Sequence, residues 1–315
     1  MSVKLKTMEY NSFVNYFKEH YGARLQKVVI DAGFSCPNVG GCTFCDNAAF
    51  HPNYATPSHS IAWQIEEGIK FHKVRYRKAQ RYIAYFQPHS NTFAPLEKLK
   101  ELYEQALSHP LIEGIVVGTR PDCIDEAKLD YFAELSKNKI VIIEYGVESI
   151  YNKTLERINR GHTFEQSCWA IQQTAQRGIT QCAHFIFGLP NESRDEMLRY
   201  AEVINTLPVT AVKFHQLQII RGTKIEKEYE RCKEEFYNFT LDSYLEFIAE
   251  IIERLREDIY IDRFAGEVPP RFLSPLQQSW GLVRYQELTR MLEQKIAHRE
   301  EESRMAKDKN WKTEL

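Results

Sequence analysis

Short apolar runs alternate along the chain with longer stretches in which apolar residues recur with helical spacing. Six of the short runs are apolar or β-branched and end near Gly, Pro or a polar cluster, which is typical of strands buried in a parallel sheet. The predicted strands are residues 27–32, 81–87, 114–119, 140–147, 181–189 and 211–220.

Amphipathic helices are predicted between these strands. Residues 59–76 show the pattern, because Ile61, Ile65 and Ile69 fall on one helical face and follow a serine that can cap the helix. Six strands alternating with helices predict right-handed βα units in a parallel sheet, either barrel-like or doubly wound. The other predicted helices are residues 95–108, 125–137, 163–177 and 193–207.

The pattern changes after residue 222. Residues 224–237 are highly charged, and residues 224–235 among them are predicted to form a solvated face. Residues 241–256 and 277–298 have the spacing of amphipathic helices. The tail from Arg299 is charged and is predicted to be frayed. Three parts are therefore predicted: an N-terminal segment at residues 1–25, a barrel core at residues 26–222 and a C-terminal helical extension at residues 223–315.

Composition narrows the class of protein. The 315 residues carry 41 Lys and Arg against 43 Asp and Glu, so the formal net charge is −2 and no overall positive field attracts nucleic acid. No apolar run reaches the roughly 18 residues of a transmembrane helix, and the first ten residues lack a signal-peptide pattern. We therefore expect a cytoplasmic protein, in which the seven cysteines are metal-binding, catalytic or buried thiols rather than disulfides.

Three of the cysteines, Cys36, Cys42 and Cys45, lie within ten residues directly after the first predicted strand. Gly40 and Gly41 between them allow the backbone to turn sharply, so that the three thiolates can converge. Soft thiolate ligands select zinc, copper(I) or an iron–sulfur cluster. This loop is the strongest candidate for chemistry in the sequence.

The number of ligands leaves two hypotheses open. A structural zinc site needs four ligands, and His51 could supply the fourth in a zinc-stabilised binding module. An iron–sulfur cube with four protein thiolates would need a fourth cysteine. Three cysteines would instead leave one iron open for a small ligand.

The loop also resembles the cluster loop of radical S-adenosylmethionine (SAM) enzymes. The closest resemblance is to a bacterial subfamily related to Elongator-type and coproporphyrinogen-oxidase-type radical SAM proteins, although the five-residue spacer between Cys36 and Cys42 is shorter than usual there. Segments that match this subfamily follow one another in the same order, each near a predicted strand end. They are residues 27–34, 84–92, 119–123, 144–149, 159–162, 184–190 and 213–218.

The resemblance implies an α/β fold, specifically a partial (β/α)6 TIM-type barrel with a C-terminal helical extension. It implies that Cys36, Cys42 and Cys45 bind a [4Fe–4S] cluster whose fourth iron binds SAM. It also implies an external one-electron reductant of the flavodoxin or ferredoxin type, and hydrogen-atom abstraction from an unreactive C–H bond. Elongator-type relatives act on the wobble uridine of tRNA, which makes that side chain the leading candidate substrate; a small molecule or a protein stays open.

The resemblance further implies that SAM is contacted by residues near the strand ends. Each has a competing local explanation, such as a turn, a helix cap or an Arg–Asp pair. The predicted cofactor-binding residues are Phe44, Gln87, Asn91, Thr92, Arg120, Asp122, Glu148, Ser149, Arg160, Gly188, Pro190 and Gln218.

Other polar residues have two open interpretations. His184, His215 and Gln216 alternate along the last two predicted strands, so some of them must face the barrel interior, as pocket residues or as satisfied core groups. Cys123 and Cys182 are either radical or sulfur relays or buried, inert thiols. A basic cluster that could contact tRNA phosphates, or simply form a solvated helix face, comprises Lys73, Arg75, Arg77, Lys78 and Arg81.

Overall fold

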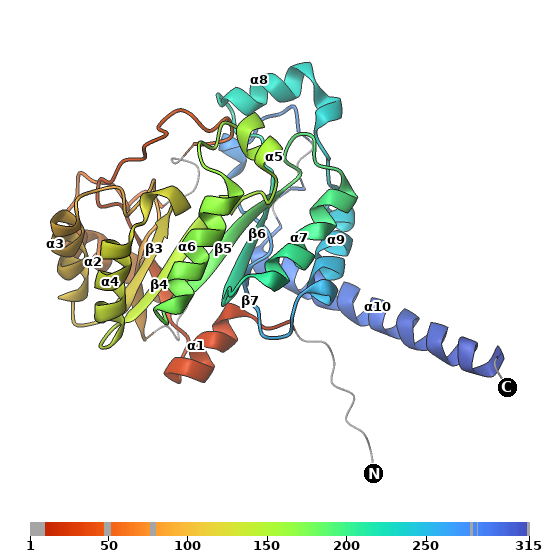
Figure 1. Ribbon diagram of the computed structural model, residues 1–315, viewed down its shortest axis with the longest axis horizontal. Helices are drawn as coiled ribbons and strands as arrows, with labels where there is room; N and C mark the ends of the chain where they lie inside the picture. The colour runs from red at the N-terminus through yellow and green to blue at the C-terminus, as the bar shows by residue number, and fades with distance from the viewer. Residues whose placement is uncertain (1–9, 47–51, 76–79, 278–279, 282, 314–315) are drawn as a thin grey trace, which may run out of the picture.

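The computed structural model describes residues 10–46, 52–75, 80–277, 280–281 and 283–313. The described chain forms one sheet of seven parallel strands, in which each strand pairs with the next in sequence and the first and last strands are not paired (Figure 1). The sheet curls into an open half-barrel, which confirms the predicted partial TIM-type barrel. The strands are β1 (Gln26–Ile30), β2 (Tyr82–Phe86), β3 (Ile112–Thr119), β4 (Ile140–Glu148), β5 (Thr180–Phe187), β6 (Ala211–Gln216) and β7 (Tyr260–Arg263).

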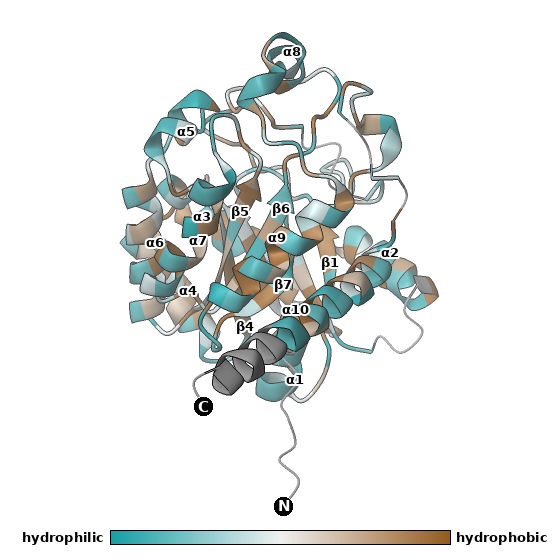
Figure 2. Cartoon of the chain, turned by 90° about the vertical axis from the view of Figure 1, so that its right-hand side faces the viewer, coloured by the Kyte–Doolittle hydropathy of each residue, from teal (hydrophilic) through white to brown (hydrophobic). Residues whose placement is uncertain are grey.

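Helices cover the outer face of this sheet. Their apolar sides and the outward-facing strand residues form the main hydrophobic core, while polar residues face outward (Figure 2). None of the helices in the described ranges is long and apolar enough to cross a membrane. The helices are α1 (Phe13–Tyr21), α2 (Ile61–Arg75), α3 (Leu96–Leu107), α4 (Glu126–Ser136), α5 (Asn152–Arg157), α6 (Phe164–Gln176), α7 (Arg194–Thr206), α8 (Lys224–Arg231), α9 (Leu241–Arg254) and α10 (Tyr285–Thr313).

Helix α1 belongs to the inner face of the barrel instead. It starts at the cap Ser12, whose side chain accepts a hydrogen bond from Asn15 N, and it carries Phe13 and Phe17 into a second core. That core is formed with inward-facing apolar residues of the strands, among them Ile83 and Val116 on β2 and β3. The N-terminal segment, which had no predicted element, therefore closes the inside of the barrel from one end.

The structure corrects the predicted number of strands. The six predicted strands are present, but a seventh, β7, pairs in parallel with β6 and lies within the predicted C-terminal extension. Only four residues long, β7 includes Asp262 and Arg263, so it has no apolar run that would mark it in the sequence. The sheet therefore continues past residue 222.

The C-terminal region also differs in its helices. The charged stretch contains α8, which buries Ile225 and Tyr229 and exposes the charged residues between them, so this stretch is more than a solvated face. Helix α10 begins at Tyr285 rather than 277 and continues to Thr313, through the tail that was predicted to fray. That tail is rich in Glu, Lys and Arg, which favour helix without needing a packed face.

Candidate active site

A cavity of about 520 Å³ opens at the carboxyl ends of the strands. The cysteine loop forms one wall, and inward-facing residues of β2 to β6 form the others. In parallel βα barrels this end of the sheet is where ligands and reacting groups gather. The cavity is therefore the candidate active site.

The cysteine loop is fixed by hydrogen bonds to two helices beyond the barrel. Thr43 N donates to Ile158 O at 3.0 Å, next to the end of α5, and Ile225 N of α8 donates to Thr43 O at 2.9 Å. Asn38 holds the middle of the loop, because its Nδ2 donates to Asn159 O at 2.7 Å and to Cys42 Sγ at 3.3 Å. These contacts hold the loop over the mouth of the barrel.

Both glycines of the loop are needed by the backbone. Gly40 has a φ of 66°, in the left-handed region that glycine adopts without strain. A Cβ atom on Gly41 would lie 1.8 Å from Oδ1 of Asn38, so any larger residue would displace the side chain that binds Cys42. The predicted role of these glycines in turning the loop agrees with this geometry.

The three thiols of Cys36, Cys42 and Cys45 line the same cavity. Burial raises the pKa of the Cys45 thiol to about 11, and the nearby Cys42 adds to the increase while Arg160 opposes it. The three soft donors fit an iron–sulfur cluster. In the part of the chain that is described, no three His, Cys, Asp or Glu side chains are grouped closely enough to hold a single metal ion.

Two arginines stand beside the cysteines. Arg160 donates from Nη2 to Gly146 O at 2.7 Å, lies 3.4 Å from the Glu148 carboxylate and approaches Cys42 Sγ at 3.6 Å. Its Nε is buried and lacks a hydrogen-bond partner among the described residues. Arg120 donates two parallel hydrogen bonds, of 2.9 and 2.8 Å, to the Asp122 carboxylate, and a third of 2.7 Å to Arg160 O. A guanidinium with unused donors is suited to bind a carboxylate.

Half of the predicted cofactor-binding residues line this cavity together with the three cysteines. Glu148 does so with a φ of 71° at an irregularity in the pairing of β4 and β5, which turns its side chain out of the regular strand pattern. The residues that the structure brings together are Phe44, Gln87, Arg120, Glu148, Arg160 and Gln218.

Four of the other six have side chains or backbone engaged elsewhere in the protein. Asn91 donates to Phe86 O at 2.9 Å and to Gly118 O at 2.8 Å, and Thr92 bonds to Thr119 Oγ1 at 2.6 Å. Ser149 donates to the buried Glu192 at 2.6 Å. A Cβ on Gly188 would lie 3.0 Å from Tyr237 O. The cavity lining does not include the other six residues predicted to bind SAM, which are Asn91, Thr92, Asp122, Ser149, Gly188 and Pro190.

A charged cluster inside the barrel was not recognised in the sequence. Glu144 on β4 is fully buried, and its carboxylate accepts from Lys27 at 2.6 Å and from Tyr85 at 2.7 Å. Lys27 on β1 also pairs with Asp262 on β7 at 2.9 Å and so connects the two unpaired edges of the sheet. We call this cluster the barrel floor; it comprises Lys27, Tyr85, Glu144, His184, Lys213, His215 and Asp262.

The protonation states in the barrel floor follow from burial and charge. Burial opposes ionisation of Glu144, but the positive charges of Lys213 and Lys27 hold its pKa well below the usual range. Burial, with the charge of Lys213, lowers the pKa of His184 and holds that of His215 well below the usual value. Near neutral pH the carboxylate is therefore ionised and both imidazoles are neutral.

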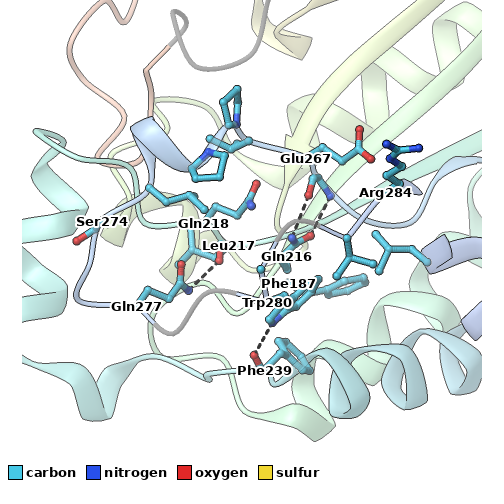
Figure 3. A pocket seen from close by; sticks show the side chains of 18 of the residues that line it. Phe187, Gln216, Leu217, Gln218, Phe239, Glu267, Ser274, Gln277, Trp280 and Arg284 are labelled. Atoms are coloured by element: carbon cyan, nitrogen blue, oxygen red, sulfur yellow. Dashed lines mark hydrogen bonds between the residues drawn. The ribbon is translucent and has the colours of Figure 1, made fainter. Parts of the chain in front are cut away.

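Of the remaining polar residues singled out in the sequence, some face the cavity and one is hydrogen-bonded within the protein. His184 and His215 face the cavity, as the alternation along their strands predicts. Gln216 is engaged with the backbone of Gly266, to whose O it donates at 3.1 Å and from whose N it accepts at 2.9 Å. Figure 3 shows these bonds in the wall of a second cavity of about 590 Å³, which shares Gln216, Leu217 and Gln218 with the first.

The scattered cysteines and basic residues sit in ordinary structural settings. Cys123 and Cys182 are buried, and burial raises the pKa of both thiols, which fits packed, inert groups. Arg81 pairs with Glu113 and donates to Tyr21 O, so it is not free to bind phosphate. His51, Arg77 and Lys78, and the side chain of Arg75, lie outside the described residues; the zinc hypothesis depends on His51.

Comparisons with known proteins agree with the geometry. The profile of the Radical SAM superfamily matches residues 35–204, and that of the Radical_SAM C-terminal domain matches residues 209–296. The protein YtqA of Bacillus subtilis (strain 168) is 34% identical over 266 residues, covering 82% of this chain and 82% of YtqA. The match favours the iron–sulfur hypothesis over the zinc module.

Two further similarities are more distant. The tRNA uridine(34) acetyltransferase of Methanocaldococcus infernus is 25% identical over 177 residues, which are 55% of this chain and 32% of that protein. A solved structure of Methanocaldococcus infernus Elp3 superposes with a TM-score of 0.66 and 16% identity, covering 87% of this chain and 63% of that chain, which shows a shared fold. Proteins of the superfamily whose profile matches this chain bind a [4Fe–4S] cluster and SAM, and these are the cofactors of this protein. The chain belongs to the radical SAM superfamily.

Proposed function

We propose that this radical SAM enzyme abstracts a hydrogen atom from a side chain on the wobble uridine of tRNA. The observation that carries the proposed chemistry is that Cys36, Cys42 and Cys45 line one cavity at the carboxyl ends of a parallel half-barrel. Held by the three thiolates and given one electron by a flavodoxin- or ferredoxin-type reductant, a cluster would cleave SAM reductively and so supply the radical chemistry that takes a hydrogen atom from an unreactive C–H bond.

The chain's own residues have three tasks in this proposal. The three thiolates hold the cluster and leave one iron open for the amino and carboxylate groups of SAM. Arg160 and Arg120 face the same space and supply positive charge for the carboxylate. Phe44, at the cavity wall, packs near the adenine, and the surrounding apolar strands keep water away from the reacting groups.

The choice of tRNA as substrate is supported by the partial similarity to the tRNA uridine(34) acetyltransferase. The net charge of −2 adds no support, and Arg81, one of the predicted phosphate contacts, is paired within the protein. The substrate proposal therefore depends on a direct comparison of nucleosides.

The experiment compares tRNA nucleosides by mass spectrometry from cells that lack the gene and from cells complemented with the wild-type chain. We expect the deletion to change a wobble-uridine nucleoside, and the wild-type gene to restore it. Complementation with Cys42→Ser should fail, whereas Cys168→Ser, which alters a half-buried cysteine on α6, should succeed. Identical wobble nucleosides with and without the gene would reject tRNA as the substrate.

A further inference from the structure

The barrel floor lies deeper in the barrel than the cysteine loop, and the proposed cofactor contacts do not use it. Its two lysines, Lys27 and Lys213, balance the two carboxylates, Glu144 and Asp262. Because His184 and His215 are neutral, the whole cluster carries no net charge. Buried charges persist in proteins when they are paired in this way, so a further role must come from an unused polar atom.

The two lysines differ in how tightly they are held. Lys27 contacts Glu144 at 2.6 Å and Asp262 at 2.9 Å, which are the distances of strong charge-assisted bonds. Lys213 lies 3.3 Å from Glu144, 3.8 Å from Asp262 and 3.2 Å from the Tyr85 hydroxyl. Lys27 is thus the main counter-ion of the carboxylates, and the ammonium of Lys213, which faces the cavity and donates two hydrogen bonds, has one N–H left.

Glu144 fixes the position of these groups and has little capacity left. One of its oxygens accepts from Lys27, and the other accepts from Tyr85 at 2.7 Å, His184 at 2.9 Å and Lys213 at 3.3 Å. A carboxylate with four donors is a poor base. It instead holds the groups around it in one arrangement that faces the cavity.

His215 supplies the unused polar atom. The ring is half-buried and faces the cavity, parallel to within 25° of the His184 ring at 6.3 Å. Its Nε2 is buried and has no hydrogen-bond partner among the described residues. An unsatisfied buried nitrogen costs about 1–3 kcal/mol, so a partner for it is expected in the working enzyme.

We propose that Lys213 and His215 bind an oxygen acceptor of the substrate, a carbonyl or carboxylate oxygen close to the reacting C–H bond. The proposal rests on the proposed function in so far as the substrate enters this cavity. Both groups are donors, with Lys213 giving an ammonium N–H and neutral His215 giving its Nε2–H. Lys213 and His215 can bind the same oxygen, because positions 213 and 215 of β6 face the same side of the strand.

The charge balance of the barrel floor separates the two kinds of acceptor. A carbonyl leaves the cluster neutral, whereas a carboxylate adds a buried negative charge that is best matched by a proton on a histidine. Burial and the neighbouring Lys213, Arg263 and His184 oppose protonation of His215, and only Glu144 favours it. A carboxylate should therefore bind more weakly than a carbonyl near neutral pH.

The test uses the holoenzyme, loaded anaerobically with its cluster and SAM, and two small probes, acetamide and acetate. Binding is followed by saturation-transfer NMR near neutral pH, where both imidazoles are neutral. Bound SAM prevents acetate from occupying the site for the SAM carboxylate. We expect acetamide to bind more tightly than acetate, which identifies a carbonyl; tighter binding of acetate identifies a carboxylate.

The variants decide whether these two residues are responsible. Lys213→Met and His215→Phe should each weaken probe binding about tenfold or more. His215→Phe keeps a planar, uncharged aromatic ring and removes both nitrogens, so it tests the claim even if Lys213→Met does not fold. Lys128→Met is the control, because it removes a lysine that pairs with the exposed Asp125 and is absent from the described cavity lining. Unchanged probe binding in both variants, or no binding to the wild type, would overturn the proposal.

Its outcome is separate from that of the tRNA proposal. Unchanged wobble nucleosides in the deletion strain, combined with loss of probe binding in the variants, would reject tRNA and retain Lys213 and His215 as substrate contacts. Changed wobble nucleosides, combined with undiminished probe binding in the variants, would support tRNA as the substrate and reject Lys213 and His215 as substrate contacts.

Discussion

The cysteine loop and the barrel floor face the same cavity but are organised in opposite ways. The loop is held mostly through its backbone and through Asn38, and its three thiols line the cavity as candidate ligands. The barrel floor is already assembled, with every oxygen of Glu144 bonded to a donor from another strand. The loop is thus completed by a cofactor, whereas the barrel floor is completed by the protein.

This difference assigns different tasks to the two ends of the cavity. A loop that presents three soft thiolates to a cavity can bind an iron–sulfur cluster. A rigid floor can hold a substrate group in one position, which is what a selective hydrogen abstraction needs. The two regions should therefore respond differently to substitution, the loop through cofactor content and the floor through stability.

The largest effect is expected at the loop. Cys42→Ser removes a thiolate that lines the cavity, so cluster content should fall to background and activity by at least about a thousandfold, since the radical chemistry is the cofactor's. Iron content and the visible absorption of the anaerobically reconstituted protein check this. Cys168→Ser, at a half-buried position on α6, is the control and should reconstitute fully. A Cys42→Ser protein with normal iron content would contradict the ligand assignment.

At the barrel floor, Lys27→Met should reduce stability rather than cofactor content. It leaves buried Glu144 and nearby Asp262 without their tightest counter-ion, and breaking a buried pair from one side costs about 3–5 kcal/mol. Urea unfolding of the cluster-free protein measures this. Lys128→Met, which breaks a pair with the exposed Asp125, should cost less than about 1 kcal/mol. Equal losses in the two variants would show that the buried pairing is not special.

A second buried carboxylate sharpens the comparison. Glu192 accepts from Ser149 and Tyr200 but has no cation paired with it among the described residues, and burial raises its pKa to about 7. Because the folded state binds this proton more tightly than the unfolded state, stability should fall as the pH rises from about 4.5 to about 7, by an amount of order 3 kcal/mol.

Glu192→Gln removes this titration. Relative to wild type, the variant should therefore gain stability between about pH 5 and about pH 8, as measured by urea unfolding at the two pH values. A difference between variant and wild type that is the same at both pH values would show that Glu192 titrates normally.

The smallest effect is expected from Asn38→Ala in the cysteine loop. It removes the side-chain bonds to Asn159 O and Cys42 Sγ, which should cost about 1 kcal/mol and slow cluster assembly without preventing it. The rise of visible absorption during reconstitution measures the rate. Assembly as fast as in wild type would mean that Asn38 does not prepare the loop.

The sequence predicted the parts of this molecule that depend on local pattern. Apolar runs mark β1 to β6, and closely spaced cysteines mark the loop. Strand β7 was missed because four residues that include Asp262 and Arg263 have no apolar run, and their pairing is decided by the neighbouring β6.

The barrel floor was missed because its members come from six separate strands and meet only through the curl of the sheet. A signal was present nonetheless. Lys27, Glu144 and Lys213 are charged residues inside otherwise apolar predicted strands, where an isolated charge would be costly. Such residues predict one another as partners, although the sequence alone does not say which strands bring them together.

The central claim is that three thiolates hold a [4Fe–4S] cluster with one iron open to SAM, and electron paramagnetic resonance of the reconstituted, reduced protein tests it most directly. With about four irons per chain, adding SAM should change the spectrum of the reduced cluster, because SAM binds that iron. A spectrum unaffected by SAM, or a colourless protein that retains zinc in place of iron, would contradict the account.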